Sequence, residues 1–263
     1  MPNLEYDPGP PSEFFEHFKK MPSYEPFKEY FWIDWGPIFY RGRLDGTAKV
    51  LCIASDPGPT ERIAGRTLVG DAGQRTQGFI EKIGLKRSYL CLNAYSVALF
   101  PRKADDAERE VLPDQEHLTW RNKLYDLAKS PSVKAVIAFG EQAQRAVAMW
   151  PGASSVRVFR VPHPSSREET VLLDKWRAAI TSLRDLVTPD SGGDPAQPNY
   201  GLEFTENDYR RIPAFDLPFG AASFLGDDAH VRATGTERNS VRRPKPDDRH
   251  TLHWIAPKVF DLD

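Results

Sequence analysis

The sequence predicts a three-layer α/β/α sandwich around a central, mostly parallel sheet of four strands. Four short apolar runs are bounded by turn-forming residues, and their lengths are typical of strands that are buried within a sheet. Stretches with the apolar spacing of helices separate these runs. Such alternation of strands and helices is typical of a parallel sheet that helices cover on both sides. The predicted strands are 50–54, 88–97, 135–139 and 156–161.

The chain has 263 residues, which is enough for one α/β domain of about 150–200 residues and two extensions. We expect residues 1–46 to form an N-terminal extension that packs on the core, and residues 47–187 to form the α/β domain. From Thr188 onward, Pro, Gly and charged residues become frequent and periodic segments are few. Residues 188–263 are therefore expected to form an irregular C-terminal extension.

The N-terminal extension contains one predicted helix. It begins near Ser12, because Pro11, Ser12 and Glu13 resemble a helix start and aromatic residues follow at helical spacing. Residues 33–44 are also rich in aromatic residues and end at a turn dipeptide, so they are compatible with a strand that leads into the first core strand.

Helices are expected between the core strands and after the last one. The first covers 76–83 and ends at Gly84, a residue suited to a helix C-terminus. The others cover 108–130, 140–149 and 168–187. The last of these has a clear apolar face, formed by Leu172, Trp176, Ile180 and Leu183.

Charge and hydropathy exclude some classes of protein. The formal net charge of −2 is not typical of a strong nonspecific nucleic-acid binder, although a local basic face remains compatible with it. No apolar run approaches the roughly 20 residues that cross a bilayer. The N-terminus lacks the basic and apolar regions of a signal peptide. We therefore expect a cytoplasmic protein that has no membrane partner, and we take a monomer as the default state.

The chain has two cysteines, Cys52 and Cys91, and each lies in an apolar strand. Both are expected to be small buried core residues. Two cysteines cannot form a four-cysteine zinc or iron–sulfur site. No metal and no other cofactor is predicted.

Polar side chains follow three of the predicted strands. Asp56 comes after the first strand, Asn93 lies near the end of the second, and His163 comes after the fourth. Open α/β folds bind their ligands at the carboxyl ends of the strands, so these side chains can converge on one pocket. Each also has a structural interpretation, because Asp and Asn commonly satisfy backbone groups in turns.

A glycine-rich loop follows Asp56 and leads into the first core helix. It contains Gly65, Gly70 and Gly73. Glycines allow the backbone of such a loop to approach a ligand closely, and N–H groups at a helix start can bind an anion.

Together these stretches resemble the uracil-DNA glycosylase superfamily over roughly residues 45–187. The motifs come in the same order: a polar Pro-Gly loop, a glycine loop, a strand ending in Asn, and a late His-Pro-Ser. The thermophile-type branch reads Gly-Glu-x-Pro-Gly, then Glu, then Gly-x-Pro-Phe-Val-Gly-x-Ala-Gly. The matching residues here are Ala54-Ser55-Asp56-Pro57-Gly58, Glu61 and Gly65-Arg66-Thr67-Leu68-Val69-Gly70-Asp71-Ala72-Gly73.

The resemblance implies a monofunctional DNA glycosylase of base excision repair, which hydrolyses the N-glycosidic bond of deoxyuridine and releases uracil. Such enzymes reach their target bond by taking the base out of the stack. The partners would be uracil-containing DNA and abasic-site DNA. Asp56 would position the attacking water and offset the positive charge on the sugar. Asn93 would read the base, and His163 would stabilise the leaving uracil anion.

The resemblance also implies which residues line the base pocket and which hold the DNA backbone. The base-binding residues besides Asn93 would be Leu68, Gly58, Ser55 and Glu61. The phosphate-binding residues would be Ser165, Ser166, Arg167, Gly70, Arg66 and Arg75.

The chain mixes features of two branches of this family. Asp56 directly precedes Pro57, as in the best-known branch, which reads Gly-Gln-Asp-Pro-Tyr; the thermophile-type branch has its Glu at the place of Ser55. Leu68 replaces a Phe that stacks on the base, and Gly58 replaces the Tyr of the best-known branch. The iron–sulfur cysteines of the thermophile-type branch are missing. Two alternatives therefore stay open: a glycosylase for another deaminated or mismatched base, or a noncatalytic protein that binds abasic sites or lesions.

The C-terminal extension lies outside the resemblance. Apolar residues within it argue against complete disorder, so we expect it to dock on the domain as irregular structure. It is either a structural strap or a contributor to the DNA-binding face, and three basic residues near its end favour the second role. The apolar residues are Phe215, Leu217, Pro218, Phe219, Phe224 and Leu225, and the basic ones are Arg242, Arg243 and Lys245.

Overall fold

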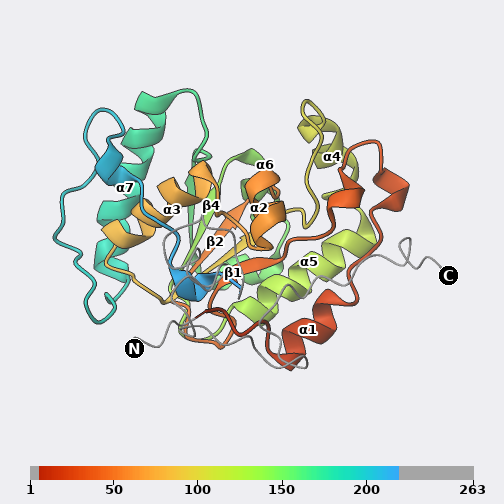
Figure 1. Cartoon of the computed structure of the whole chain (residues 1–263), viewed down its shortest axis with the longest axis horizontal. Helices are drawn as coiled ribbons and strands as arrows, with labels where there is room; N and C mark the ends of the chain where they lie inside the picture. The colour runs from red at the N-terminus through yellow and green to blue at the C-terminus, as the bar shows by residue number, and fades with distance from the viewer. Residues whose placement is uncertain (1–5, 219–263) are drawn as a thin grey trace, which may run out of the picture.

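The computed structural model describes residues 6–218, which form an α/β/α sandwich (Figure 1). The predicted fold class is therefore confirmed. The central sheet has the strand order β1-β3-β2-β4-β5. Strands β2 to β5 are mutually parallel, and β1 is antiparallel to β3. The strands are β1 (Tyr40–Gly42), β2 (Val50–Ala54), β3 (Tyr89–Asn93), β4 (Ala135–Phe139) and β5 (Arg157–Val161).

The predicted number of strands is wrong by one, because β1 adds an antiparallel edge to the four parallel strands. β1 covers only three residues of the aromatic stretch 33–44 and pairs Arg41 with Cys91 of β3. Earlier in that stretch, Ile33–Trp35 form a 3₁₀ turn, η2, instead of extended chain. Three residues are too few for an alternating pattern to distinguish a strand from a loop.

Helices surround this sheet, and two predicted helix boundaries differ from the observed ones. The stretch 108–130 contains the end of one helix, Ala104–Glu110, and the whole of a second, Gln115–Ala128, because Asp114 starts the second by accepting a hydrogen bond from the His117 amide at 3.1 Å. The helix predicted over 76–83 begins earlier, at Asp71. Among residues 6–218, none of the helices is long and apolar enough to cross a membrane. The helices are α1 (Ser12–Phe18), α2 (Pro59–Ala64), α3 (Asp71–Lys82), α4 (Ala104–Glu110), α5 (Gln115–Ala128), α6 (Glu141–Ala148) and α7 (Glu169–Leu186).

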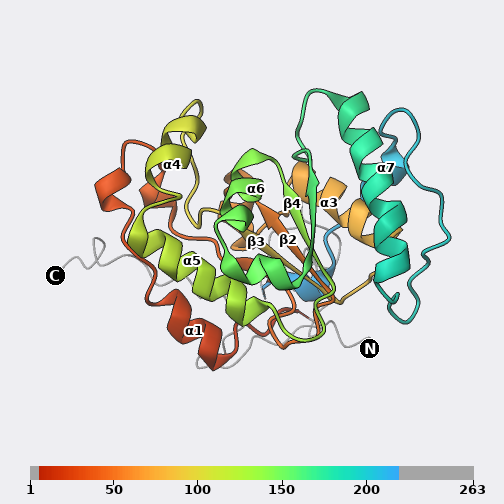
Figure 2. The same cartoon turned by 180° about the vertical axis from the view of Figure 1, so that it is seen from behind.

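The sheet separates two apolar cores, because alternate residues of a strand point to opposite faces. Cys52 of β2 belongs to the core that α3 and α7 cover, together with Phe79 and Trp176. Its neighbour Ile53 belongs to the opposite core, which α1, α5 and α6 cover. Figures 1 and 2 show α3 and α7 on one side of the sheet and α1 and α5 on the other.

Residues 188–218, here called the C-terminal strap, pack against the α/β domain. The strap contains the 3₁₀ turns η4 (Glu206–Asp208) and η5 (Ala214–Asp216). Near its start, Asp190 accepts hydrogen bonds from three consecutive backbone amides of residues 86–88, at 2.8–2.9 Å. Further along, the Asp208 carboxylate lies 3.0 Å from Lys82 Nζ on α3. The predicted apolar and basic residues beyond 218, among them Arg242 and Arg243, lie outside the described residues.

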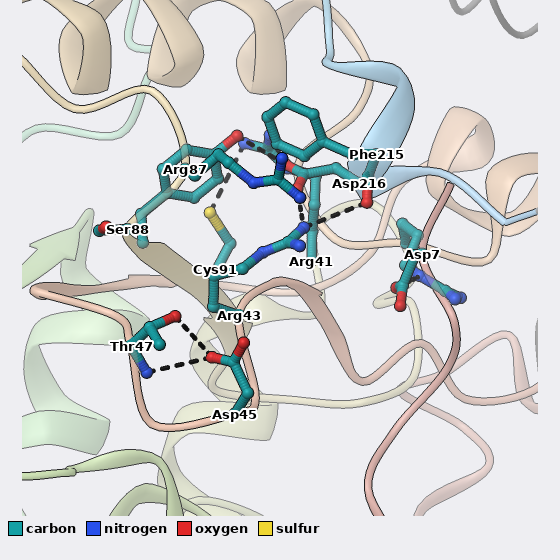
Figure 3. A network of polar contacts seen from close by, with 12 residues as sticks. Asp7, Arg41, Arg43, Asp45, Thr47, Arg87, Ser88, Cys91, Phe215 and Asp216 are labelled. Carbon is teal, nitrogen blue, oxygen red and sulfur yellow. Dashed lines mark hydrogen bonds and ion pairs between the residues drawn. The ribbon is translucent and has the colours of Figure 1, made fainter. Parts of the chain in front are cut away.

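The strap ends in a buried ion cluster beneath β1 (Figure 3). Asp216 is completely buried, and it accepts hydrogen bonds from Arg41 Nη1 at 3.0 Å and Arg43 Nη2 at 2.6 Å. The Tyr89 hydroxyl donates to the same carboxylate at 2.6 Å. Arg41 is also completely buried, and its Nη1 donates to Gln77 of α3 at 2.8 Å. One carboxylate of the strap therefore neutralises two arginines, one in β1 and one directly after it.

We expect Asp216→Ala to lower the free energy of unfolding by about 3–5 kcal/mol, because it leaves Arg41 and Arg43 without their shared buried partner. Urea unfolding followed by tryptophan fluorescence measures this change. The matched control is Asp105→Ala, at an exposed position on α4, which should cost less than about 1 kcal/mol. A loss in Asp216→Ala as small as in the control would contradict the role assigned to this cluster.

Candidate active site

The loop after β2 holds Asp56 in a largely buried position at the carboxyl end of the sheet. Its Oδ2 accepts a hydrogen bond from the Leu99 amide at 2.9 Å. Burial raises the pKa of Asp56 to about 6, although the hydrogen bonds from Leu99 and from the Ser55 side chain act in the opposite direction. A carboxylate with such a pKa can exchange a proton near neutral pH.

Asn93 ends the neighbouring strand β3 and lies next to the Asp56 loop. The β2–β3 register pairs Ala54 with Asn93, two residues before Asp56. The Asn93 side chain is 6% exposed, and among the described residues neither its Oδ1 nor its Nδ2 has a hydrogen-bond partner. An unsatisfied buried polar atom costs about 1–3 kcal/mol. Both atoms of this buried amide are therefore free to take partners from a bound ligand.

His163 follows β5, and the loop around it fixes which ring nitrogen carries the proton. The Ser165 backbone amide donates to His163 Nδ1 at 3.1 Å. An amide can only donate, so Nδ1 is the acceptor and the neutral ring carries its proton on Nε2. Burial lowers the pKa of His163 to about 4, so the ring is neutral at pH 7. His163 thus offers a neutral N–H donor.

Gly140, at the end of β4, makes room for the His163 loop. Its φ of +84° lies in the left-handed region, which L side chains rarely adopt. A Cβ at this position would also lie 3.0 Å from His163 Cβ. Any larger residue at position 140 would push the imidazole away from the sheet edge.

Glu61, on α2, connects the Pro-Gly loop to the glycine loop. Its Oε1 accepts from the backbone amides of Val69 at 2.8 Å and Gly70 at 3.0 Å, while its Oε2 accepts from that of Gly58 at 3.0 Å. The Glu61 side chain is 8% exposed, and its carboxylate holds both loops from inside the protein through these hydrogen bonds. Its predicted contact with the base stays a prediction, and the structure adds this bracing role.

Leu68 lies in the glycine loop with a strained backbone. Its φ of +54° places a branched residue in the left-handed region, at a cost of about 1–3 kcal/mol. Gly73 fits closely against it, since a Cβ on Gly73 would lie 1.9 Å from the Leu68 carbonyl oxygen. Leu68 belongs to the same apolar cluster as Ala54 and Val161, the last residues of β2 and β5. It therefore lies between the strand ends that lead to Asp56 and His163.

Some of the predicted DNA-binding residues line an open hollow beside His163. This hollow has a volume of about 510 Å³, and Ser165 and Ser166 contribute to it together with the basic residues Arg160 and Lys175. Arg167 follows directly and is exposed. Hydroxyl groups and cations at such a surface suit a phosphate backbone. Asp56 and Asn93 are not among the residues that line this hollow.

The structure does not support the predicted phosphate contacts of Arg66 and Gly70. Arg66 is 3% exposed, and its Nε donates to Asp7 at 2.7 Å, so it lies inside the protein instead of on a DNA-binding surface. The Gly70 amide is already bound to Glu61. From the sequence, an arginine in a loop can equally well face solvent or form a buried ion pair. The loop motif could not indicate which, because Asp7, the partner of Arg66, lies in the N-terminal extension.

Arg75, also predicted to contact phosphate, instead joins the C-terminal strap to the His163 loop. Its Nη1 donates to the Pro164 carbonyl at 2.9 Å, and its Nε donates to the Tyr209 hydroxyl at 2.8 Å. Its guanidinium lies 4.1 Å from the centre of the Phe204 ring. The sequence gives no signal for this role, because Phe204 and Tyr209 lie outside the family motifs.

The arrangement places an acid, an unpaired amide and a neutral imidazole at the carboxyl ends of the parallel strands, with Asn93 ending β3 and with Asp56 and His163 on the loops after β2 and β5. Such a set can bind a polar planar group and stabilise charge that develops during bond cleavage. Among residues 6–218, no group of three or more His, Cys, Asp or Glu side chains is placed to hold a metal ion.

We expect Arg75→Ala to loosen the His163 loop without unfolding the protein. The change removes a charged donor from the Pro164 carbonyl, so the amides that carry a hydrogen within 162–167, those of residues 163 and 165–167, should exchange it about tenfold faster. Hydrogen–deuterium exchange with mass spectrometry measures this, with the exposed Lys123→Ala on α5 as the control. Unchanged exchange at 162–167, or an equal increase over the whole chain, would contradict the role of Arg75.

Comparison with known proteins identifies the family. The model of the uracil DNA glycosylase superfamily matches residues 41–181, which is more than half of the chain. No curated protein matches, whereas 28 chains of solved structures do. One of them is a point mutant of the UNG from Nitratifractor salsuginis, at 14% identity and a TM-score of 0.37, over 69% of this chain and 95% of that chain. The chain belongs to the uracil-DNA glycosylase superfamily.

Proposed function

We propose that this protein is a DNA repair glycosylase that hydrolyses the N-glycosidic bond of deoxyuridine, releasing uracil and leaving an abasic site. The observation that carries the proposal is the buried amide of Asn93, both of whose polar atoms are unpaired at the active edge of the sheet. Membership of the family supports a glycosylase reaction on DNA.

Asn93 supplies the contacts that select the base. Its Oδ1 accepts from uracil N3–H and its Nδ2 donates to uracil O4. Cytosine presents an acceptor at N3 and a donor at the C4 amino group, so the same amide orientation meets it with two mismatched contacts. A site that leaves buried polar groups unpaired discriminates strongly against the wrong ligand.

Asp56 acts on the sugar side of the bond. In its ionised form it holds a water molecule for attack on C1′ and offsets the positive charge that the sugar gains as the bond to N1 breaks. The water oxygen forms the new bond to C1′, and the water loses a proton, which Asp56 accepts in this mechanism. A pKa of about 6 keeps most of this carboxylate ionised at pH 7.

His163 acts on the departing base. Its Nε2–H donates a hydrogen bond to uracil O2 as negative charge develops there, in the manner of an oxyanion hole. The donor is the neutral imidazole, since its pKa of about 4 keeps it uncharged at working pH. Electron density from the broken bond thus remains on the uracil anion, which the hydrogen bond stabilises.

Other residues complete the site. Ser55, Gly58 and Leu68 border the place of the base, and Glu61 holds the loops that carry Gly58 and Leu68 in position. Ser165, Ser166 and Arg167 bind backbone phosphates on the His163 side. Leu68 provides apolar contact without an aromatic face, which favours weaker stacking on the base and keeps a different damaged base as the second candidate substrate.

The direct test is release of uracil from a uracil-containing oligonucleotide by the purified protein, with EDTA present. We expect Asp56→Asn and Asn93→Ala each to lower kcat by about 100-fold or more, because each removes a contact to the reacting groups. Free base and alkali-labile abasic sites are measured, and Asp105→Asn on the surface serves as control. Near-wild-type rates in both variants would contradict this site.

Absence of uracil release by the folded wild type would also be informative. Release of another base from a panel of deaminated bases would establish the second candidate substrate. Tight binding of abasic DNA without release of any base would indicate a lesion-binding protein.

The pH dependence follows from the two shifted groups. Asp56 must be ionised, so kcat/KM should fall about tenfold per pH unit as the pH drops below about 6. His163 stays neutral through this range because its pKa of about 4 is lower. Initial rates of uracil release between pH 4.5 and 8 measure the profile. The limb near pH 6 should vanish from the residual rate of Asp56→Asn, and a flat wild-type profile would contradict the assignment.

A further inference from the structure

An aromatic pair at the protein surface has no part in the chemistry described so far. Among the residues that the structure describes, Trp32 is the only aromatic residue in the set of exposed large hydrophobic side chains, at 41% exposure. Its ring stacks on Trp35 of η2, with the centroids 5.5 Å apart and the planes 16° from parallel. It also contacts the Phe100 ring at a centroid distance of 4.3 Å. The contacts with Trp35 and Phe100 hold Trp32 in place while part of it stays open to solvent.

This aromatic group is attached directly to the candidate active site. The Trp32 amide donates to the Ala98 carbonyl at 2.8 Å, and Phe31 forms an antiparallel bridge with Leu99. The Leu99 amide in turn donates to Asp56 at 2.9 Å. The segment that carries Trp32 therefore pairs with the segment that fixes the predicted catalytic carboxylate.

The location agrees with the edge where DNA would run. Figures 1 and 2 show α4 and the first turn of α7 toward the same, upper edge of the molecule. Phe100 lies shortly before α4, whereas the His163 loop leads into α7. The segment that pairs with Trp32 follows β3, Asp56 follows β2, and the hollow beside His163 follows β5. In the strand order, β2 lies between β3 and β5, so Trp32 and the hollow lie on opposite sides of Asp56.

Basic residues lie beside the aromatic pair. The Arg62 guanidinium of α2 lies 5.2 Å from the centre of the Trp35 ring, and Arg102 is exposed two residues after Phe100. The segment that carries Trp32 also contains two acidic residues, Glu29 and Asp34. Aromatic faces interleaved with cations are the pattern by which proteins hold single-stranded nucleic acid, since every base can stack and the cations attract the phosphates.

We propose that Trp32, supported by Trp35 and Phe100, is a stacking platform for a nucleobase that flanks the target nucleotide in the same DNA strand. This inference rests on the proposed function, because the strand is taken to be the substrate strand. Leu68 has no aromatic ring to stack on the base inside the pocket. The platform provides an aromatic contact to the DNA outside the pocket. Since flanking bases of a duplex are already stacked on their neighbours, the platform serves single-stranded or locally opened DNA.

Binding of a single-stranded oligonucleotide tests the platform without depending on catalysis. The probe carries a tetrahydrofuran abasic analogue, which cannot be cleaved, and 2-aminopurine at the position 5′ or 3′ to it. With wild-type protein, stacking on Trp32 should quench the 2-aminopurine fluorescence in one of the two probes. Trp32→Ala and Trp32→Leu should abolish that quenching and weaken binding about tenfold, whereas Trp32→Phe should keep most of both.

Controls separate stacking from other effects. Leu202→Ala removes an exposed apolar side chain from the strap and should leave binding and fluorescence unchanged. Thermal unfolding checks that every Trp32 variant is folded at the assay temperature, because Trp32→Ala also removes the ring contacts with Trp35 and Phe100. The loss caused by Trp32→Ala should be smaller on the matching duplex, and a loss on the duplex as large as on the single strand would overturn the stacking account.

Failure of this inference and failure of the proposed function give different results. If the wild type releases uracil but Trp32→Ala binds and quenches like the wild type, the platform is wrong and the glycosylase stands. If no uracil is released while the Trp32-dependent quenching is present, the platform stands and the reaction is wrong. If Trp32→Ala only dissociates a dimer seen by sedimentation and leaves DNA binding unchanged, the face is a contact between copies and the platform is overturned.

Discussion

The buried carboxylate of Asp216 is the contact on which most of the architecture depends. It comes from the end of the chain that the structure describes, yet it neutralises Arg41 and Arg43 under the strands at the start of the sheet. Burying a guanidinium without a partner is strongly unfavourable, so the sheet edge and the strap must form together. The C-terminal strap is thus part of the folded domain, and through Arg75 it reaches the loop that carries His163.

The candidate active site is organised by hydrogen bonds from backbone amides of its own loops. Glu61 holds two loops through backbone amides, and the Ser165 amide sets the proton position on His163. Burial of the same site raises the pKa of Asp56 to about 6 and lowers the pKa of His163 to about 4. The chemical groups were visible in the sequence, but the contacts that hold them in position involve backbone atoms, which carry no sequence signature.

The sequence predicted the α/β/α layers and the four parallel strands, because continuous apolar runs and helical apolar spacing can be read without knowing any tertiary contact. It also predicted Asp56, Asn93 and His163 as candidates, since strand ends define where ligands bind. It could not separate Arg66 and Arg75 from surface arginines. Their partners come from residues far away in the chain, and the charge pattern of a loop is the same whether its arginines face solvent or a buried acid.

The region that the family shares, 41–181, does not coincide with the unit that folds. The shared region contains the buried Arg41 and Arg66, while their carboxylate partners, Asp216 and Asp7, lie beyond its two ends. Homology therefore marks the part that carries the candidate site, whereas buried ion pairs tie that part to the segments on both sides of it. The segments around Asp7 and Asp216 are needed because they neutralise arginines that lie inside the family region.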